Sequence, residues 1–537
     1  MDRNKEMQHG IVADIDRPRS AWDREFTHKT SFNVGQIVPF YFDMDIIPGT
    51  TIKNKTTMVL RLSTPLNPTM DNLYADTYYF KASKFWYWEH FRRMMGENDY
   101  GAWTQTIEYT EPKISNIGIS LPTWGHGDFA SYIGVRQGTE NLAWSKLAIN
   151  MYIDIWNQWF RDQNLQAPII IDKTDTTVMA DGTISTGFGL LNACRFHDYF
   201  SACLPQPQKG GPISTPLGIS APIVGNGVFG LTRGGTDTNH SLAVTEGTGN
   251  AHPIVLGGAS PSGASGNSSL YYGTGLQVDL TNATAATINA LRLAFATQRI
   301  LERDSMAGTR YRELLRAHYG STPDDEAILT PEYLGGHRIP INIETVLQNS
   351  STDSTSPLGY TGAVSVTLDV NEDFTKSFMK DDMLMGLVVI RADHTYQQGL
   401  PRQLTRLGRL DRYWPELSHI GNQPVYNYEI YAQGNTYDDG VFGYKEAWQE
   451  YMYKPNMITG MLNSEYAQSL DTWHYGDDYS SLPVLSSNWI QETPTYVDRT
   501  LAVQSTTADQ IIADILVEQH IVAPIPLHRT PGLIDHF

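Results

Sequence analysis

The most constraining feature of this chain is a helical stretch, residues 284–320, in a sequence that is otherwise β-like and rich in loops. Apolar residues recur here on two lines at helical spacing: Ile288, Leu291 and Phe295 on one, Leu293 and Ile300 on the other. The two lines fall on roughly opposite sides of the helix. A helix that is apolar on two sides needs two surfaces to pack against. We therefore expect this helix to brace a β scaffold or to contact a neighbouring chain.

Residue types also mark the helix ends. Gly308 is expected to end the first helix, and Thr309 to cap a second one. Gly320, followed by Pro323, is expected to end that second helix. Another helix is predicted over 140–161, on a stripe typical of a buried face: Trp144, Ala148, Met151, Ile155 and Trp159.

The rest of the chain alternates between strand-like segments and loops. Segments rich in β-branched or aromatic residues predict strands at 32–47, 56–64, 73–82, 338–348, 363–370, 386–393 and 425–433. Length alone, at 537 residues, predicts about three domains. However, the 45 Gly and 28 Pro are spread along the chain without a linker-like break. Strand candidates at both ends with insertions between them fit one jelly roll, whose first and last strands pair in one sheet.

Charge and cysteine content exclude several classes of protein. A net charge of −19 argues against binding nucleic acid over the whole surface, which requires many Lys and Arg. The two cysteines cannot build a secreted disulfide framework, and they suit a reducing cytoplasm. No run of about 18 apolar residues occurs, so membrane insertion is not expected. Residues 1–30 are polar and predict an N-terminal arm.

Several longer motifs resemble those of one known family. The string INALRLAFATQRILERDSMAGTRYRELLRAHYG, followed by PEYLGG, is similar to the major capsid proteins of the Microviridae, and of gokushoviruses in particular. LSTPLNPTMDNLYADTYYF, HDYFSACLPQPQKG and the terminal PGLIDHF also resemble that family. Before Pro48-Gly49 the family usually has acidic and leucine residues, whereas this chain has Met44, Asp45, Ile46 and Ile47. This difference concerns the assignment to a subfamily and not the resemblance to the family.

The resemblance implies a mainly β chain with a single jelly roll, an eight-stranded antiparallel sandwich over 31–537, carrying long loop and helical insertions. It also implies self-assembly into a T=1 icosahedral shell around circular single-stranded DNA, in a virion assembled in the bacterial cytoplasm. The implied partners are further copies of the chain, a small basic DNA-binding protein, a DNA pilot protein, an internal scaffolding protein and a host surface receptor.

Residues 209–283 differ in composition from the rest of the chain. They are rich in Gly, Ser, Thr, Asn and Pro, and no helical period is present. So long an insert is expected to be functional or disordered, with little packed core of its own. The resemblance implies a surface insertion that contacts the host, and a lectin-like host-binding spike is a further reading.

Arginines concentrate on the helical pair of this acidic chain: Arg292, Arg299, Arg303, Arg310, Arg312 and Arg316. One reading is contact with phosphates of packaged DNA. The favoured reading is salt bridging to Glu302, Glu313 or acidic residues of a neighbouring subunit. Ile288, Leu291, Leu293, Phe295 and Ile300 are the candidates for packing between subunits.

Chemical motifs are weak throughout. The G-x-G-x-x-G match at 225–230 lacks the strand and helix that dinucleotide binding needs. Cys194, His197 and Cys203 have irregular spacing for zinc, and the Asp-Asp pairs at 381–382, 438–439 and 477–478 are typical of solvated turns. We expect no catalytic, cofactor or metal site and no enzyme activity. The alternative is a cytoplasmic β-rich carbohydrate-active enzyme or carbohydrate-binding protein, since the chain has 29 Tyr and 12 Trp.

Overall fold

The computed structural model describes residues 18–97, 108–115, 125–139, 142–176, 178–179, 189–211, 213, 223–225, 231–233, 243–246, 254–257, 270–272, 276–278, 288–350, 352–354 and 357–527. The chain divides into two compact units. One combines Met1–Lys209 with Arg303–Phe537, and the other is Gly210–Glu302.

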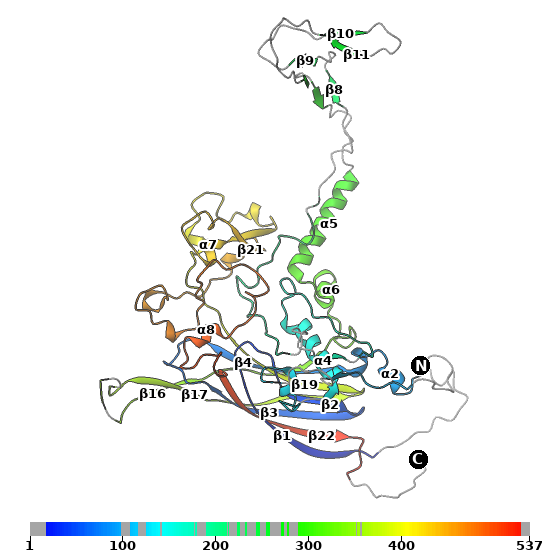
Figure 1. Ribbon diagram of the computed structural model, residues 1–537, viewed down its shortest axis with the longest axis vertical. Helices are drawn as coiled ribbons and strands as arrows, with labels where there is room; N and C mark the ends of the chain where they lie inside the picture. Colours follow the sequence, from blue (N-terminus) through cyan, green and yellow to red (C-terminus); the bar gives the residue numbers. More distant parts are fainter. Residues whose placement is uncertain are drawn as a thin grey trace, which may run out of the picture. The chain divides into compact units, whose positions relative to one another are not determined.

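Two antiparallel sheets form the centre of the larger unit (Figure 1). The first has the order β1–β22–β3–β18, with bounds Ser20–Phe32, Ile511–Ala523, Thr50–Leu62 and Thr367–Phe378. The second has the order β14–β4–β19–β2, with bounds Glu332–Gly335, Leu73–Ser83, Asp382–Ala392 and Val38–Ile46. β15, Arg338–Pro340, pairs with β4 on the same side as β14.

The strand order is that of a jelly roll. With β14 and β15 taken as one interrupted strand, the eight strands numbered along the chain are ordered 1-8-3-6 in the first sheet and 5-4-7-2 in the second. The first and last strands are neighbours over their whole length, with Ser20 opposite Ala523 and Phe32 opposite Ile511. The predicted mainly β fold with a single jelly roll is therefore confirmed.

Burial along the strands follows from this arrangement. In β3 and β22 every second residue is buried, as expected for a sheet with one covered face. In β19 every residue is buried, because both of its faces are covered. Val388 packs into the core between the sheets, whereas Val389 packs into a second core with α4, Lys146–Ile155. The sandwich therefore has a helical layer on one side.

The predicted N-terminal arm is wrong in its extent. β1 begins at Ser20 and pairs with β22, so residues 20–30 belong to the sheet, and residues 1–17 lie outside the described part. β1 is an edge strand in which only Phe32 is fully covered, so its sequence lacks the apolar alternation that marks β3. That is why a polar segment was read as an arm.

The helical predictions hold with shifted boundaries. The helix predicted over 140–161 is α4 followed by a π-helical turn at Trp156–Phe160, and Trp144 lies in the short strand β6 before it. Ser145 caps α4 by accepting a hydrogen bond from the Leu147 amide at 3.2 Å. The expected pair is present as α5, Ile288–Ala307, and α6, Tyr311–Tyr319.

Glycines end both helices of this pair as predicted. Gly308 follows α5 with a φ of +102°, and Gly320 ends α6 with a φ of +70°. The expected cap at Thr309 is wrong, because the residue that precedes α6 is Arg310. Its amide donates to the Glu313 carboxylate at 3.3 Å.

Short elements make up the insertions. They are α2 Phe91–Met94, β5 Lys113–Ser115, α3 Phe129–Tyr132, β6 Ala143–Ser145, β7 Val178–Met179, β16 Ile343–Leu347, β17 Thr361–Ser365, β20 Asn422–Tyr426, α7 Asn427–Ile430, β21 Val441–Glu446 and α8 Thr495–Asp498. The strand predicted over 425–433 is therefore wrong after Tyr426, where one turn of helix begins. No helix in the described residues is long and apolar enough to cross a membrane.

The smaller unit holds most of the predicted 209–283 insertion. Three nested antiparallel pairs are described there: β8 (Ile223–Gly225) with β13 (Leu276–Val278), β9 (Leu231–Arg233) with β12 (Leu270–Tyr272), and β10 (Ala243–Glu246) with β11 (Ile254–Gly257). The later three strands therefore pair with the earlier three in reverse order. The expectation of a structureless insert is wrong for these segments, and the other residues of 214–283 lie outside the described part.

Candidate functional site

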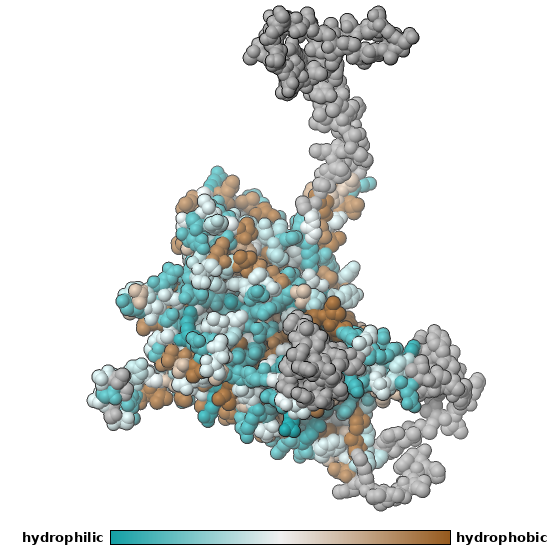
Figure 2. All heavy atoms as spheres, viewed as in Figure 1, coloured by the Kyte–Doolittle hydropathy of each residue, from teal (hydrophilic) through white to brown (hydrophobic). Residues whose placement is uncertain are grey.

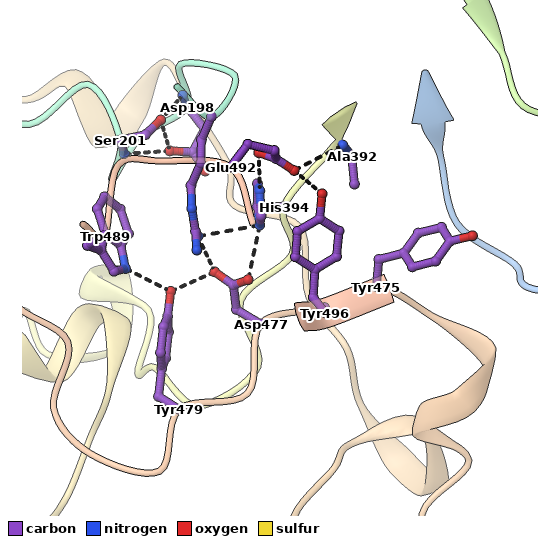
Figure 3. A network of polar contacts seen from close by, with 12 residues as sticks. Asp198, Ser201, Ala392, His394, Tyr475, Asp477, Tyr479, Trp489, Glu492 and Tyr496 are labelled. Carbon is purple, nitrogen blue, oxygen red and sulfur yellow. Dashed lines mark hydrogen bonds and ion pairs between the residues drawn. The ribbon is translucent and has the colours of Figure 1, made fainter. Parts of the chain in front are cut away.

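A group of buried ionisable side chains lies among the loops of the larger unit (Figure 3). His394 is held between two carboxylates: its Nδ1 lies 3.0 Å from Asp477 and its Nε2 lies 3.0 Å from Glu492. Arg195 donates to the other oxygen of Asp477 at 2.5 Å. All four side chains are buried. We call these four residues the His394 network.

Backbone hydrogen bonds hold the four residues in position. His394 follows the end of β19, and the amide of Asp477 donates to the carbonyl of Thr395 at 2.8 Å. The amide of Glu492 donates to Ala193, and the amide of Arg195 donates to Ile490, each at 2.9 Å. Three distant loop segments therefore meet at the end of a central strand.

Aromatic side chains complete the surroundings of this network. Tyr479 donates to Asp477 at 2.6 Å, and Trp489 donates from its indole nitrogen to Tyr479 at 3.2 Å. Tyr496 donates to Glu492. The Arg195 guanidinium lies 5.0 Å from the centre of the Trp489 ring, which is within cation–π range.

The carboxylates of the network stabilise its two cations. Burial and the nearby Arg195 cation disfavour the charged imidazolium of His394, but Glu492 and Asp477 outweigh both and raise the pKa of His394 to about 9. Burial alone would raise the pKa of Asp477; Arg195 and His394 instead hold it well below its usual range. The network therefore carries two cations and at least one carboxylate anion at neutral pH.

This arrangement is suited to fastening loops rather than to proton transfer. A general base needs a free nitrogen that can reach a substrate. Both ring nitrogens of His394 are already bonded to carboxylates of the same chain. The network resembles a buried salt-bridge cluster, in which removing one partner leaves an uncompensated charge.

A cavity of about 360 Å³ lies in the same group of loops. Two glutamates line it, Glu429 and Glu450. Glu429 accepts from Arg402 at 3.2 Å and from Tyr199 at 3.1 Å, and Glu450 accepts from Arg406. Because arginines hold both carboxylates, the cavity does not present the free acid and base that glycoside hydrolysis needs.

Of the six predicted arginines, two are bonded within the chain and four are exposed. Arg310 donates to the carbonyls of Asn157 at 3.1 Å and Arg161 at 2.8 Å, so it anchors α6 to the end of the α4 segment. Arg312 is bonded to Asp325 at 2.5 Å. The remaining four are exposed: Arg292, Arg299, Arg303 and Arg316. Of the predicted acidic partners, Glu313 is bonded to Arg310 of the same chain at 3.3 Å.

The predicted packing residues of α5 are all exposed. Their exposed fractions are 69% for Ile288, 40% for Leu291, 69% for Leu293, 66% for Phe295 and 51% for Ile300. The two apolar lines are thus present on α5, whose residues 288–302 belong to the smaller unit. An exposed apolar surface of this kind is a candidate for contact with another molecule.

The weak motifs resolve into structural roles. Cys194 and Cys203 are free and buried, and burial raises the pKa of these thiols to about 11 and about 12. The described residues contain no group of three or more His, Cys, Asp or Glu placed to hold a metal. Residues 226–230 of the glycine motif lie outside the described part.

Two acidic residues that sequence reasoning assigned to solvated turns are buried. Asp382 lies beside Ser83 and Lys81, and Asp477 belongs to the His394 network. The remaining pair was read correctly, since Asp438 accepts from the amides of Gln433 and Gly434 in an exposed loop. No local pattern distinguishes these cases, because the partners of Asp477 are far away in sequence.

Comparison with known proteins gives a consistent result. Residues 12–533 match a family described as capsid protein (F protein). The chain is 33% identical to capsid protein VP1 of Bdellovibrio phage phiMH2K, an alignment that covers 100% of this chain and 99% of that protein. It is 34% identical to VP1 of Spiroplasma virus 4, covering 94% of each, and 31% identical to VP1 of Chlamydia phage 1, covering 96% of each.

Proposed function

The chain belongs to the capsid protein (F protein) family and is a major capsid protein of the Microviridae type, and from that premise we propose that its copies close into a T=1 icosahedral shell around circular single-stranded DNA. The family consists of structural capsid proteins and not enzymes, which removes the carbohydrate-active enzyme from the alternatives. The virion is then the site of this protein, and the host cytoplasm the proposed site of assembly.

The exposure of the α5 apolar lines is the observation that carries the assembly proposal. The jelly roll closes its own core, so it does not need α5 for folding. Permanent interfaces bury about 2,000–5,000 Å² and are more apolar than ordinary surface. Rings of an icosahedral shell use heterologous contacts whose rotations close. Ile288, Leu291, Leu293, Phe295 and Ile300 would therefore be covered by neighbouring subunits.

The negative charge of the chain supports the proposal that another protein neutralises the DNA inside the virion. A subunit with a net charge of −19 repels DNA phosphates over most of its surface. We therefore propose that a small basic DNA-binding protein neutralises most of the genome. A DNA pilot protein and an internal scaffolding protein are the other proposed partners. The exposed arginines of α5 and α6 would contact acidic residues of neighbours or, in the alternative, the DNA.

Electron microscopy and nuclease treatment test these proposals together. The chain, expressed with its phage partners, should give uniform shells whose reconstruction has T=1 symmetry. The extracted nucleic acid should be degraded by a nuclease specific for single-stranded DNA and resist ribonuclease. Monomers under all packaging conditions would refute self-assembly, and a double-stranded or RNA content would refute the genome assignment.

The smaller unit supports a second proposal, that the 209–283 insertion contributes to host attachment. Residues 210–302 form their own compact unit, and the core residues of the sandwich lie in the larger one. Deletion of 211–282 should leave shells that form but adsorb poorly to host cells. Normal adsorption by such shells would refute the proposal, including its lectin-like version.

A further inference from the structure

The hairpin formed by β16 and β17 exposes more apolar surface than a two-stranded element tolerates alone. Ile343 packs against the sandwich core, but the other five large apolar residues have exposed fractions of 50% for Val346, 58% for Leu347, 63% for Leu358, 56% for Tyr360 and 46% for Val364. β16 pairs only with β17 in the described structure, and Figure 1 shows the hairpin extending away from the two sheets. An isolated two-stranded hairpin is marginal in water. A covering partner is therefore expected.

The charge of the hairpin indicates the chemistry of that partner. Residues 343–365, which span the hairpin, include two acidic residues, Glu344 and Asp353, and neither Lys nor Arg. Nucleic acid is disfavoured as the partner, because its phosphates would be repelled. A basic apolar surface would fit.

The same chain carries such a surface in the loop 400–414. The loop contains four arginines and one acidic residue. Three leucines project from it, with exposed fractions of 63% for Leu404, 91% for Leu407 and 72% for Leu410. Arg402 and Arg406 are bonded to Glu429 and Glu450, whereas Arg409 and Arg412 are exposed at the loop surface.

The loop also borders the cavity of about 360 Å³ described above. Met452 and Met457 line the cavity, with exposed fractions of 90% and 59%. Flexible, polarisable methionines are well suited to accept an apolar side chain from a partner. Figure 2 shows hydrophobic residues exposed over this lobe, around the position of α7 and β21 in Figure 1.

We propose that the β16–β17 hairpin of one subunit docks on the 400–414 loop of the next, with the tip residues Leu358 and Tyr360 entering the cavity beside Met452. The acidic hairpin and the basic loop are complementary in charge, and both are apolar at their centres. Two different surfaces of one chain make a heterologous contact, which generates a ring when its rotation closes. The inference rests on the proposed self-assembly and adds to it a particular pair of surfaces.

Disulfide trapping tests the contact in assembled shells. In Tyr360→Cys combined with Met452→Cys, mild oxidation should give a ladder of covalent multimers that ends at the size of a ring. The native thiols do not compete, because Cys194 and Cys203 are buried. The matched control combines Tyr360→Cys with Ile170→Cys, whose native side chain is 91% exposed but lies on neither surface.

The outcomes separate this inference from the proposed function. A ladder in the first pair and none in the control supports the contact. Intact shells without a ladder, or an equal ladder in the control pair, overturn the contact while self-assembly stands. If the unsubstituted protein forms no shells, self-assembly itself fails.

A charge exchange provides an independent test. Glu344→Arg and Arg409→Glu should each lower the yield of shells at least tenfold, because each places like charges in contact. The double variant should recover most of the yield. Two single variants that assemble normally, or a double variant as poor as either single one, would contradict the proposed pairing of these surfaces.

Discussion

The His394 network makes the stability of the loops depend on pH in a direction that the structure fixes. The pKa of His394 is raised from 6.5 to about 9. Because the pKa of His394 is higher in the folded protein than in the unfolded chain, protonated His394 stabilises the folded loops. This stabilisation is fully present below pH 6.5 and is lost as the pH rises to about 9. At about 1.4 kcal/mol per pKa unit, the loss is about 3 kcal/mol, or roughly a hundredfold in the equilibrium for opening the loops.

Hydrogen–deuterium exchange of the dissociated subunit measures this loss directly. Peptides that contain residues 393–397, 475–479 and 489–497 should lose about a hundredfold in protection between pH 6.5 and pH 9, after correction for intrinsic exchange. Strands in the sandwich core, such as β3, should show a much smaller change. His394→Gln should remove the pH dependence, because its side chain does not titrate.

A surface histidine provides the matched control. His520 lies 2.7 Å from Asp23, but the two side chains are 55% and 81% exposed, so the pair contributes little. His520→Gln should therefore keep the wild-type pH dependence. Unchanged protection between the two pH values, or an equal pH dependence in His394→Gln, would refute the assignment of the charged histidine to the stability of these loops.

Three further predictions concern other parts of the chain. Charge reversal by Arg299→Glu with Arg303→Glu should reduce shell yield in sedimentation assays if α5 pairs with acidic neighbours; normal shells with less DNA would assign these arginines to the genome instead. Gly308→Ala should lower the free energy of unfolding by about 1–3 kcal/mol, because the φ of Gly308 is +102° and the added methyl group would overlap the carboxylate of Glu313 in α6. Urea titration measures this change, and an unchanged unfolding midpoint would contradict it. Cys194 and Cys203 should resist iodoacetamide at pH 8 until the protein is unfolded, since burial raises the pKa of both thiols; rapid labelling of native protein would contradict their burial.

Sequence alone was sufficient for the elements whose pattern is local. β4 and β19 are buried strands rich in aromatic or β-branched residues, so their apolar runs mark them. The glycines that end α5 and α6 are likewise local signals. β1 was missed because an edge strand with one partner needs few apolar residues. Residues 427–430 were misassigned because Tyr428 and Ile430 favour strands, while the Glu429 carboxylate accepts the Tyr426 amide at 3.0 Å and starts a helical turn.

The His394 network could not be predicted, because its geometry depends on contacts between distant segments. Arg195 and His394 are 199 residues apart, and His394 and Asp477 are 83 apart. Asp477 was noticed only as half of an acidic pair, a pattern shared with the exposed Asp438. A buried carboxylate is distinguished from a solvated one by its partners, and partners brought together by tertiary folding leave no signature in spacing.

The distribution of exposed apolar residues indicates which surfaces of the chain are candidates for assembly. Scattered exposed apolar residues are normal on any protein. Here most of them lie in the connections between jelly-roll strands: α5 between β4 and β14, the β16–β17 hairpin between β15 and β18, and 404–470 between β19 and β22. The sandwich strands bury most of their apolar residues, with Leu368 and Val370 of β18 and Ile512 of β22 among the exposed ones. Substitutions at the exposed apolar residues of these connections should therefore change assembly at nearly constant subunit stability, whereas substitutions at core positions such as Ile515 should lower both.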